Sequence, residues 1–498
     1  MTHVEHFPFG LTQAKFVIAG LGPAIPLSLA LPFRAKRDGR DKPGHDDSAQ
    51  VENALAATEA ARIHAPGLQF SLEALRGALL WLTGFFGAFV FIEPSPYEIA
   101  SLLAIIAFAV TGLSLTPAVM PLAALLVLYN AGFAIAVVPV LDRPKALLWV
   151  LVSCYLSITA LFFAAMLGRN TAARVRLLLR GTTSAAGLSA IVAIVGYFHL
   201  VPGSDLFLLY DRARGTFNDP NVLGAFMVLP ALLAFQRVLA ARVIDSLRAG
   251  ALLLVLLTAL FLSFSRGAWA QFAFSAAILM GLSFITTQST RERLRIALFA
   301  IAGAVLIAAF VLALLSIGQV AELFKERASL EQSYDLGYTG RFGRHLLGVV
   351  MALDNPFGLG PLQFRTYFPE DPHNAYLNAF ASGGWISGLA YLALTATTLL
   401  SGLRLAFVTT PWRPVYLAVY AAFVGVAAES VLIDSDHWRH YFLILGVLWG
   451  LMAASHSYAA FGRARQRRPA VSAARIASGG GMASGGRPEA LAGRAATT

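Results

Sequence analysis

The sequence predicts an all-α, polytopic membrane protein of about twelve transmembrane helices with one large loop. Three observations predict this fold class. The 498-residue chain is 57% hydrophobic and only 13% charged, whereas soluble proteins carry about 25% charged residues. Its mean hydropathy is +0.67. Apolar runs of about 20 residues recur along the chain, and each is long enough to cross the hydrocarbon core of a bilayer.

These apolar runs define a membrane domain over residues 71–462. The predicted spans are 76–94, 97–115, 118–139, 146–167, 182–201, 220–239, 248–264, 267–287, 295–316, 375–400, 413–433 and 439–458. The longest polar loop, residues 317–374, lies between the ninth and tenth spans.

The two ends of the chain differ from this domain. An apolar run from Phe16 to Phe33 is interrupted by glycine and proline, and residues 34–47 resemble translated copies of a short intergenic repeat of bacterial genomes. We therefore expect residues 1–70 to be an atypical segment, disordered or a translated repeat, with a weak first helix or a signal sequence as the alternative. Residues 463–498 are rich in Gly, Ala, Ser and Arg, which predicts a disordered tail.

Arginine positions predict the orientation of the spans. With the N-terminus inside, the inner side carries the arginine clusters at 169–180, 237–248, 291–295, 404–413 and 463–468. This agrees with the enrichment of basic residues in cytoplasmic loops, although Arg143 and Lys145 fall outside. The net charge of +11 therefore indicates membrane topology, and we expect no nucleic-acid partner.

The predicted outer face gathers most of the remaining polar residues. These belong to the 202–219 loop, the 265–267 link, the 317–374 loop and the 434–438 turn. Within the long loop, residues 355–361 (Asn-Pro-Phe-Gly-Leu-Gly-Pro) predict a turn that leads the chain back to the membrane.

A histidine and an amide, His373 and Asn374, stand at the predicted start of the tenth span. Histidine is the side chain that most readily exchanges a proton near neutral pH. The preceding Asp371-Pro372 pair predicts an N-cap and a first helical residue, as Asp219-Pro220 does before the sixth span. Both helices then direct free N–H groups at the outer face, where they favour anions. The competing interpretation is that Asp-Pro only starts a helix.

Arginines accompany these helix starts. Arg212 and Arg214 precede the sixth span, Arg266 heads the eighth, and Arg341 begins a predicted loop helix that runs to about Asp354. The planar guanidinium suits a diphosphate and keeps its charge. The alternative for each is contact with water or lipid phosphate, and for Arg212 we favour that alternative.

Glu429 is an acid inside the eleventh predicted span. Intramembrane acids are costly and usually functional, and a buried pair with an outer arginine is the alternative. The sequence shows no metal-ligand spacing, Walker phosphate loop or Gly-x-Ser-x-Gly elbow. We therefore expect no metal and no cofactor.

Together these segments resemble the O-antigen ligase and polymerase superfamily of bacterial envelope glycosyltransferases. The resemblance covers roughly residues 75–460, apart from variable early spans, and rests on residues 215–221, 265–267, 340–341, 355–360 and 371–377. It implies a GT-C-like helical fold and a glycan donor linked to undecaprenyl diphosphate. It also implies a catalytic histidine at His373 and diphosphate-binding loop arginines at Arg214 and Arg341, with Arg212 as the alternative match to Arg214. Beside these we predict Asn374, Asn221 and Arg266 as diphosphate or substrate ligands, and Glu429, Arg212 and Tyr376 as supporting residues.

The implied reaction is a metal-independent glycosyl transfer at the inner membrane, with the active site facing the periplasm. An acceptor hydroxyl attacks the anomeric carbon of the donor sugar, and undecaprenyl diphosphate leaves. The expected acceptor is the lipid A core for a ligase, or another lipid-linked repeat for an O-antigen or exopolysaccharide polymerase. A transporter of polysaccharide or lipid-linked sugar and an envelope assembly scaffold are the alternatives from other classes.

Overall fold

The computed structural model describes residues 66–240, 243–328 and 340–467. Within these residues the fold is all-α, as predicted, apart from one antiparallel pair of two-residue strands. Nearly all of the predicted N-terminal segment 1–70 and most of the predicted tail 463–498 lie outside the described residues.

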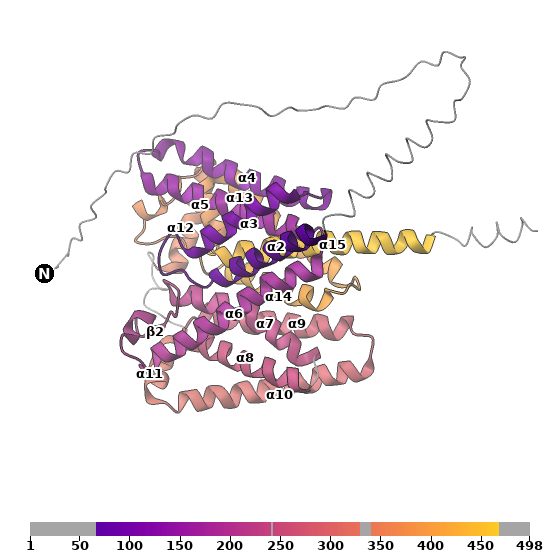
Figure 1. Cartoon of the computed structure of the whole chain (residues 1–498). Coiled ribbons are helices and arrows are strands. Elements are labelled where there is room, and N and C mark those ends of the chain that lie inside the picture. Colours follow the sequence, from indigo (N-terminus) through magenta and orange to yellow (C-terminus); the bar gives the residue numbers. More distant parts are fainter. Residues whose placement is uncertain (1–65, 241–242, 329–339, 468–498) are drawn as a thin grey trace, which may run out of the picture. The chain divides into compact units, whose positions relative to one another are not determined.

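The helices follow one another through short connections (Figure 1). The first half comprises α2 (Pro66–Phe86), α3 (Pro96–Gly112), η1 (Pro117–Val119), α4 (Met120–Ala136), η2 (Val138–Val140), α5 (Pro144–Met166), α6 (Thr171–Tyr197), η3 (Ser204–Phe207), β1 (Leu208–Leu209) and β2 (Arg212–Ala213). The second half comprises α7 (Pro220–Ala240), α8 (Val243–Leu262), α9 (Arg266–Thr286), α10 (Thr290–Leu315), α11 (Gly318–Ala328), α12 (Arg341–Asp354), η4 (Phe364–Thr366), α13 (Ala375–Ala406), α14 (Arg413–Glu429) and α15 (Arg439–Arg467).

Each predicted span falls largely on one of these helices. Among the described residues, nine helices are long and apolar enough to cross a membrane. Helices α3 and α14 have 17 residues each and are shorter than that limit. The structure therefore confirms a polytopic helical membrane protein, and the full number of crossings stays a prediction.

Local sequence signals explain several helix starts. Ser95 caps α3 in a capping box: its N–H donates to Glu98 Oε2 at 2.6 Å, and Pro96 occupies the first helical position. Ser265 caps α9 by accepting a hydrogen bond from the N–H of Ala268. These caps satisfy N–H groups that have no partner inside the helix.

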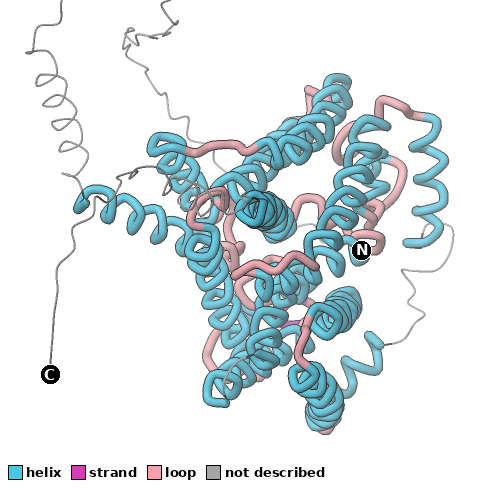
Figure 2. The backbone as a smooth tube through the Cα atoms, turned by 90° about the vertical axis from the view of Figure 1, so that its right-hand side faces the viewer, coloured by secondary structure: helices cyan, strands magenta, loops and turns pink. Residues whose placement is uncertain are grey.

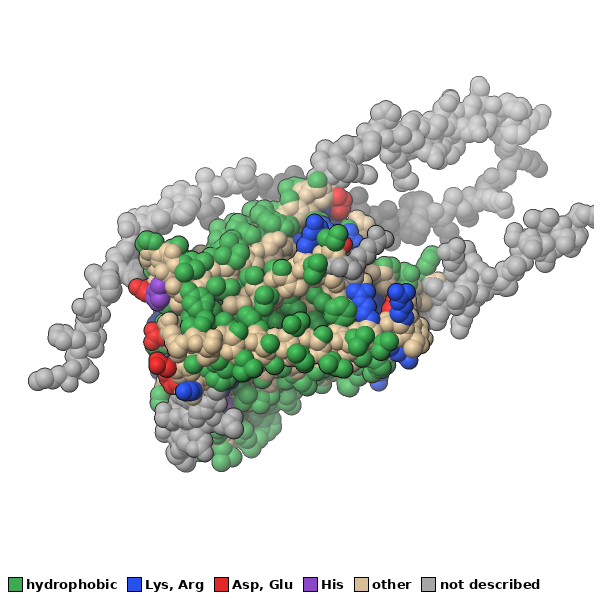
Figure 3. All heavy atoms as spheres, turned by 90° about the horizontal axis from the view of Figure 1, so that it is seen from below, with side chains coloured by type: hydrophobic (Ala, Val, Ile, Leu, Met, Phe, Trp, Pro, Cys, Tyr) green, Lys and Arg blue, Asp and Glu red, His purple; other side chains and the backbone are tan. Residues whose placement is uncertain are grey.

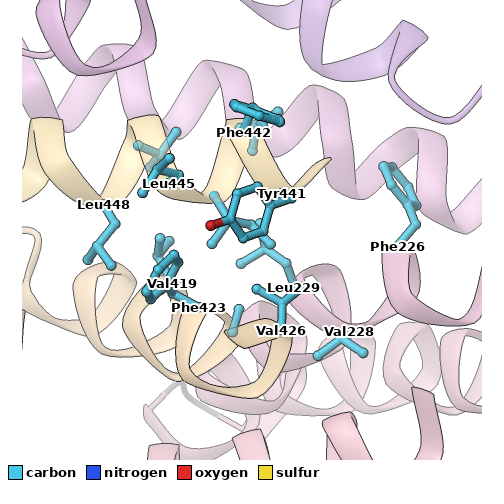
Figure 4. Close-up of a cluster of buried hydrophobic side chains, with 14 of the residues drawn as sticks. Phe226, Val228, Leu229, Val419, Phe423, Val426, Tyr441, Phe442, Leu445 and Leu448 are labelled. Atoms are coloured by element: carbon cyan, nitrogen blue, oxygen red, sulfur yellow. The ribbon is translucent and has the colours of Figure 1, made fainter. Parts of the chain in front are cut away.

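Long-range helix pairs build the core. Helix α13 packs on α4, α15 on α5, and α14 on α9 and α7. Figure 2 shows several helices nearly along their axes, packed beside one another and joined by loops at their ends. Figure 4 shows part of this core, where side chains of α7, α14 and α15 interdigitate; these include Phe226, Leu229, Phe423, Val426, Tyr441 and Leu445.

Helix α13 is broken inside the membrane domain, whereas the sequence predicts a continuous span at 375–400. Gly384 has φ 69° and ψ −168°, and the turn at 355–361 fits against it. The N–H of Trp385 donates to Pro356 O at 2.9 Å. A β-carbon on Gly384 would lie 2.6 Å from the carbonyl carbon of Phe357, so glycine is required. The predicted turn thus supplies hydrogen bonds at the break.

Charged side chains segregate between the ends of the helices. On the face seen in Figure 3, most Lys and Arg side chains gather at one end with a few acids among them, while the other end carries acidic side chains and a histidine. Figure 1 shows β2, α11 and α12 together at one end. The long loop and the 202–219 loop therefore share one end of the membrane domain, as the predicted topology requires.

Candidate functional site

The imidazole of His373 lies just before α13, with a carboxylate against each ring nitrogen. Nδ1 is 3.3 Å from Asp434 Oδ2, and Nε2 is 3.2 Å from Glu370 Oε2. Asp434 belongs to the turn between α14 and α15. It also accepts hydrogen bonds from the backbone N–H groups of His373 at 3.2 Å and Asn374 at 2.9 Å. One carboxylate therefore orients both the backbone and the ring of the histidine.

The backbone of His373 is strained. Its φ is +51°, in the left-handed region that costs a non-glycine residue about 1 kcal/mol. The two N–H bonds to Asp434 hold this conformation. The histidine is thereby kept outside the helix, with its side chain 34% exposed.

The predicted cap of this helix is wrong. Asp371 and Pro372 do not start α13, because the helix begins three residues later. Asn374 is the cap, and its Oδ1 accepts a hydrogen bond from the N–H of Leu377 at 3.0 Å. Asp371 instead forms an ion pair with Arg365, whose Nε donates at 2.8 Å. The side-chain oxygen of Asn374, predicted to bind substrate, is therefore used in the helix start.

The first turn of α13 is fixed from the side by α14 and the following turn. The hydroxyl of Tyr376 donates to Ala427 O at 2.8 Å. Asn378 Nδ2 donates at 2.9 Å to Asp436 Oδ2, and Asp436 is 1% exposed. Tyr376, predicted as a supporting residue, therefore supports the position of the helix that follows His373.

Glu370 links His373 to a buried arginine. Arg344 Nη2 donates to Glu370 Oε2 at 3.0 Å, and Arg344 is 3% exposed. Its Nε and Nη1 have no hydrogen-bond partner among the described residues. Burial alone would raise the pKa of Glu370, but the bond from Arg344 and the charge of His373 outweigh burial and lower that pKa. Glu370 is therefore a carboxylate at neutral pH.

Helix α12 supplies the other wall of the site, and it runs from Arg341 to Asp354 as predicted. His345 Nε2 lies 2.7 Å from Pro372 O. Since a carbonyl only accepts, this nitrogen carries the proton. Burial lowers the pKa of His345, so its ring is neutral at pH 7. The charge of Arg341 acts on both His345 and His373, so the structure brings these three groups together.

The pKa of His373 lies above its ordinary value of 6.5. The hydrogen bond to Asp434 is the largest cause, and the nearby Glu370 adds to it, while burial and the charge of Arg341 oppose the rise. The imidazolium form is stabilised, and the ring becomes a proton acceptor only as pH rises past this raised value.

The predicted start of the sixth span is confirmed. Helix α7 begins at Pro220, and Asp219 Oδ1 accepts a hydrogen bond from Asn221 N at 2.6 Å. Arg212 is 8% exposed. Its Nη2 donates to Asn221 Oδ1 at 2.7 Å and its Nε to Ser263 O at 2.8 Å. The favoured interpretation of Arg212 as a solvated side chain is therefore wrong: it ties the start of α7 to the end of α8.

Arg214 points to different partners. Its Nε and Nη2 donate to Leu206 O at 3.2 and 3.0 Å, and the guanidinium lies 5.4 Å from the centre of the Phe91 ring. It forms no ion pair with an acid within the described part of the chain. Its positive charge is therefore not neutralised by a described carboxylate, as an anion-binding role requires.

Glu429 lies against the start of α9. A β-carbon on Gly267 would be 2.8 Å from Glu429 Oε1. Glu429 is 5% exposed, and neither carboxylate oxygen has a hydrogen-bond partner among the described residues. The alternative of a buried arginine pair thus finds no bond within that part of the chain. The positive end of the α9 dipole favours a carboxylate here, so this helix end, headed by Arg266, already faces an acid of the protein.

Three helix ends meet beside these residues. Ser430, which follows Glu429, accepts a hydrogen bond from Ala375 N at 2.8 Å. The start of α13, the end of α14 and the start of α9 are therefore neighbours. Arg212 reaches the same region through Ser263. The motif segments that are distant in sequence thus converge, although the described contacts of Arg214 are with the 202–219 loop and Phe91.

Sequence reasoning assigned no role to three side chains that define the site: Asp434, Arg344 and His345. The turn containing Asp434 was predicted to share a face with the His373 loop, and two acids flanking one serine between adjacent spans were a usable signal. Arg344 and His345 fall one turn after Arg341 on the same helix, which is also visible in the sequence. Across residues 66–240, 243–328 and 340–467, no cluster of three His, Cys, Asp or Glu side chains could hold a metal ion.

Comparison with known proteins gives a family match. Residues 251–393 match the family model described as O-antigen ligase. The matched segment contains the start of α9, helix α12 with Arg341, and His373 with the first half of α13. No curated protein sequence matches the chain. With the motifs and the helical fold, this match supports an O-antigen ligase-like family for the segment from α8 to the first half of α13.

Proposed function

We propose that this protein is an O-antigen ligase that transfers a glycan from undecaprenyl diphosphate to the lipid A core. The matched family supports the coarser function, an O-antigen ligase or polymerase type of enzyme in a membrane. The donor, the acceptor and the periplasmic face belong to the proposal.

The observation that carries the proposal is the imidazole of His373 held between Asp434 and Glu370 at the start of α13. Because Asp434 occupies Nδ1, Nε2 is the ring nitrogen that can contact the hydroxyl of the glycan acceptor. The Glu370 side chain is 58% exposed, so an acceptor hydroxyl can take its place at Nε2. A histidine so oriented accepts the proton of an attacking hydroxyl.

The proposed reaction is a single displacement. The acceptor oxygen forms a bond to the anomeric carbon as the bond from that carbon to the diphosphate oxygen breaks. The hydroxyl proton goes to His373 Nε2, and both electrons of the broken bond leave with undecaprenyl diphosphate. Attack opposite the leaving group inverts the anomeric centre.

Arginines stabilise the leaving group in this scheme. Arg341 is the first candidate, because its charge reaches His373. Arg214 is the second, because it forms no ion pair within the described residues. Guanidinium groups neutralise the growing charge on a diphosphate, so the scheme uses no divalent metal. Arg266 is a weaker candidate, since Glu429 faces the same helix end.

The proposed location is the bacterial inner membrane, with His373 at the periplasmic side. The arginine clusters of the inner loops support this orientation. Nucleotide sugars are absent from that side, which favours a lipid-linked donor. A polymerase would use the same donor and the same base, with a second lipid-linked repeat as acceptor.

The break in α13 favours a transporter, since transporters build their binding sites from discontinuous helices. In this protein the turn at 355–361 packs against the break, and the N–H of Trp385 bonds to Pro356 O. The break therefore does not present these backbone groups to a substrate, and we prefer the enzyme.

The test is a deletion strain complemented with the wild-type or the His373→Ala gene, with membrane levels of both proteins matched by immunoblot. The proposal predicts that wild type restores a lipopolysaccharide ladder, whereas His373→Ala accumulates lipid-linked polymer. Short products with a single repeat would indicate a polymerase. A full ladder with His373→Ala would exclude the proposed role of His373.

A further inference from the structure

A second polar feature lies away from His373, in a groove between α6 and α8 at their arginine-rich ends. Its polar part is formed by Arg180, Thr183 and Ser184 of α6 and by Arg237 near the end of α7. Both arginines are exposed. Two cations from different helices thus line one recess.

The groove continues along an apolar track. This track is formed by Gly187, Leu188 and Ile191 of α6 and Leu252 of α8. Leu188 and Ile191 are 43% and 52% exposed. A β-carbon on Gly187 would lie 3.4 Å from Leu252 Cδ1, so the glycine leaves room that a larger side chain would fill.

The spacing on α6 places these residues on one face of the helix. Positions 180, 183, 184, 187, 188 and 191 follow the helical pattern of three and four residues. At 1.5 Å per residue, this stripe is about 16 Å long. One leaflet of the hydrocarbon core is about 15 Å thick, so the polar end and the apolar track together span about one leaflet.

The charge of the groove is not compensated by the protein. Neither Arg180 nor Arg237 forms an ion pair with an acid in the described part of the chain. The nearby acid of α8, Asp245, is 3.7 Å from Arg248 instead. The Thr183 hydroxyl donates to Leu179 O at 2.7 Å, which leaves the hydroxyl of Ser184 to contact a ligand.

We propose that this groove binds one anionic glycerophospholipid. Arg180 and Arg237 hold the phosphate, Ser184 donates a hydrogen bond to it, and an acyl chain lies along the apolar track. Basic pockets between transmembrane helices recognise acidic lipid head groups. This inference does not depend on glycan transfer, because it uses no residue of the His373 site.

Native mass spectrometry of the purified full-length protein tests the proposal, with phosphatidylglycerol as ligand and phosphatidylcholine as zwitterionic control. Removing both charges with Arg180→Gln and Arg237→Gln should weaken phosphatidylglycerol binding about thirtyfold, since each arginine near a lipid surface contributes about 1 kcal/mol. The Gly187→Leu variant should also weaken it, because the side chain fills the apolar track.

The matched control is Arg169→Gln with Arg404→Gln, which removes the same charge from exposed positions that do not line the groove. An equal loss in this control, or equal binding of phosphatidylcholine, would overturn the proposal.

Competition by inorganic phosphate with no effect of Gly187→Leu would show an anion site without a lipid. A dimer disrupted by the groove variants would show that a second copy fills the groove. Arg180→Lys with Arg237→Lys keeps the charge of the groove and should retain binding, which separates charge loss from misfolding.

Discussion

Two helices of this protein follow the same Asp-Pro pair, yet only one helix begins there. Helix α7 begins at Pro220 with Asp219 as its cap. Helix α13 begins after Asn374, and Asp371 pairs with Arg365. The local signals are equal, so the difference comes from a distant partner: Asp434 takes the N–H groups that precede α13.

This comparison shows how a helix start becomes a chemical site. At α7 the polar groups bond to one another, and Arg212 closes the arrangement on Asn221. At α13 the start is delayed by three residues, which leaves His373 outside the helix with both ring nitrogens against carboxylates. The delay therefore exposes a histidine that a regular cap would have placed within the first turn.

Removing the charge of Asp434, the distant partner of His373, should give the largest difference in transfer rate between variants of the two helix starts. Asp434→Asn keeps the shape of the side chain but removes the charge that orients His373. We expect glycan transfer to fall about 10²-fold, the lower end of what general base catalysis contributes. The measurement is the initial rate of transfer by purified protein. Asp219→Asn is the control, since asparagine caps helices equally well. Equal rates for the two variants would contradict the role of Asp434.

The second largest effect should appear in the pH dependence of transfer, which is set by His373 and Asp434 at the start of α13. His373 must lose its proton to act as a base, and the bond to Asp434 raises its pKa above 6.5. Activity should therefore rise with pH through a midpoint above 6.5, and Asp434→Asn should move that midpoint to lower pH. The charge of Glu370 also raises the pKa of His373, whereas the charge of Arg341 lowers it. Glu370→Gln should therefore move the midpoint to lower pH as well. A wild-type midpoint below 6.5 would argue against this electrostatic account.

The sequence predicted much of this arrangement from local rules. The apolar runs located the helices, Asp219-Pro220 marked the start of α7, and the segment after Gly340 predicted α12. It could not predict the contact between His373 and Asp434, because 61 residues separate them and the contact needs α13 and α14 to be packed. The burial of Arg212 depends in the same way on the end of α8.

The break at Gly384 shows the same limit. Hydropathy predicts a continuous span there, since glycine in an apolar run does not interrupt the pattern. Only the approach of the turn at 355–361 makes the positive φ of Gly384 necessary. Close backbone contacts between distant segments are therefore the part of this fold that local sequence rules do not contain.

The caps themselves should give a smaller effect, on stability. Asn374→Ala and Asp219→Ala should each lower the free energy of unfolding by about 1 kcal/mol, the usual contribution of a cap. Asp371→Ala should cost less than either. Apparent melting temperatures of the three variants in detergent provide the measurement. An Asp371→Ala variant as unstable as Asp219→Ala would restore Asp371 as the cap.

The smallest effect should come from the ion pair that replaces this cap. Arg365 is 59% exposed and Asp371 17% exposed, and surface pairs contribute about 0 to 1 kcal/mol. Arg365→Gln should leave both the melting temperature and the transfer rate near those of wild type. A large loss of transfer with unchanged stability would place Arg365 in substrate binding.

The most direct test of the central claim is the transfer rate of His373→Ala with purified lipid-linked donor and lipid A core acceptor. The control is His456→Ala, on an exposed position of α15. We predict a loss of about 10²- to 10⁴-fold for His373→Ala and a wild-type rate for His456→Ala. A His373→Ala protein that folds, inserts and transfers glycan at the wild-type rate would contradict the account.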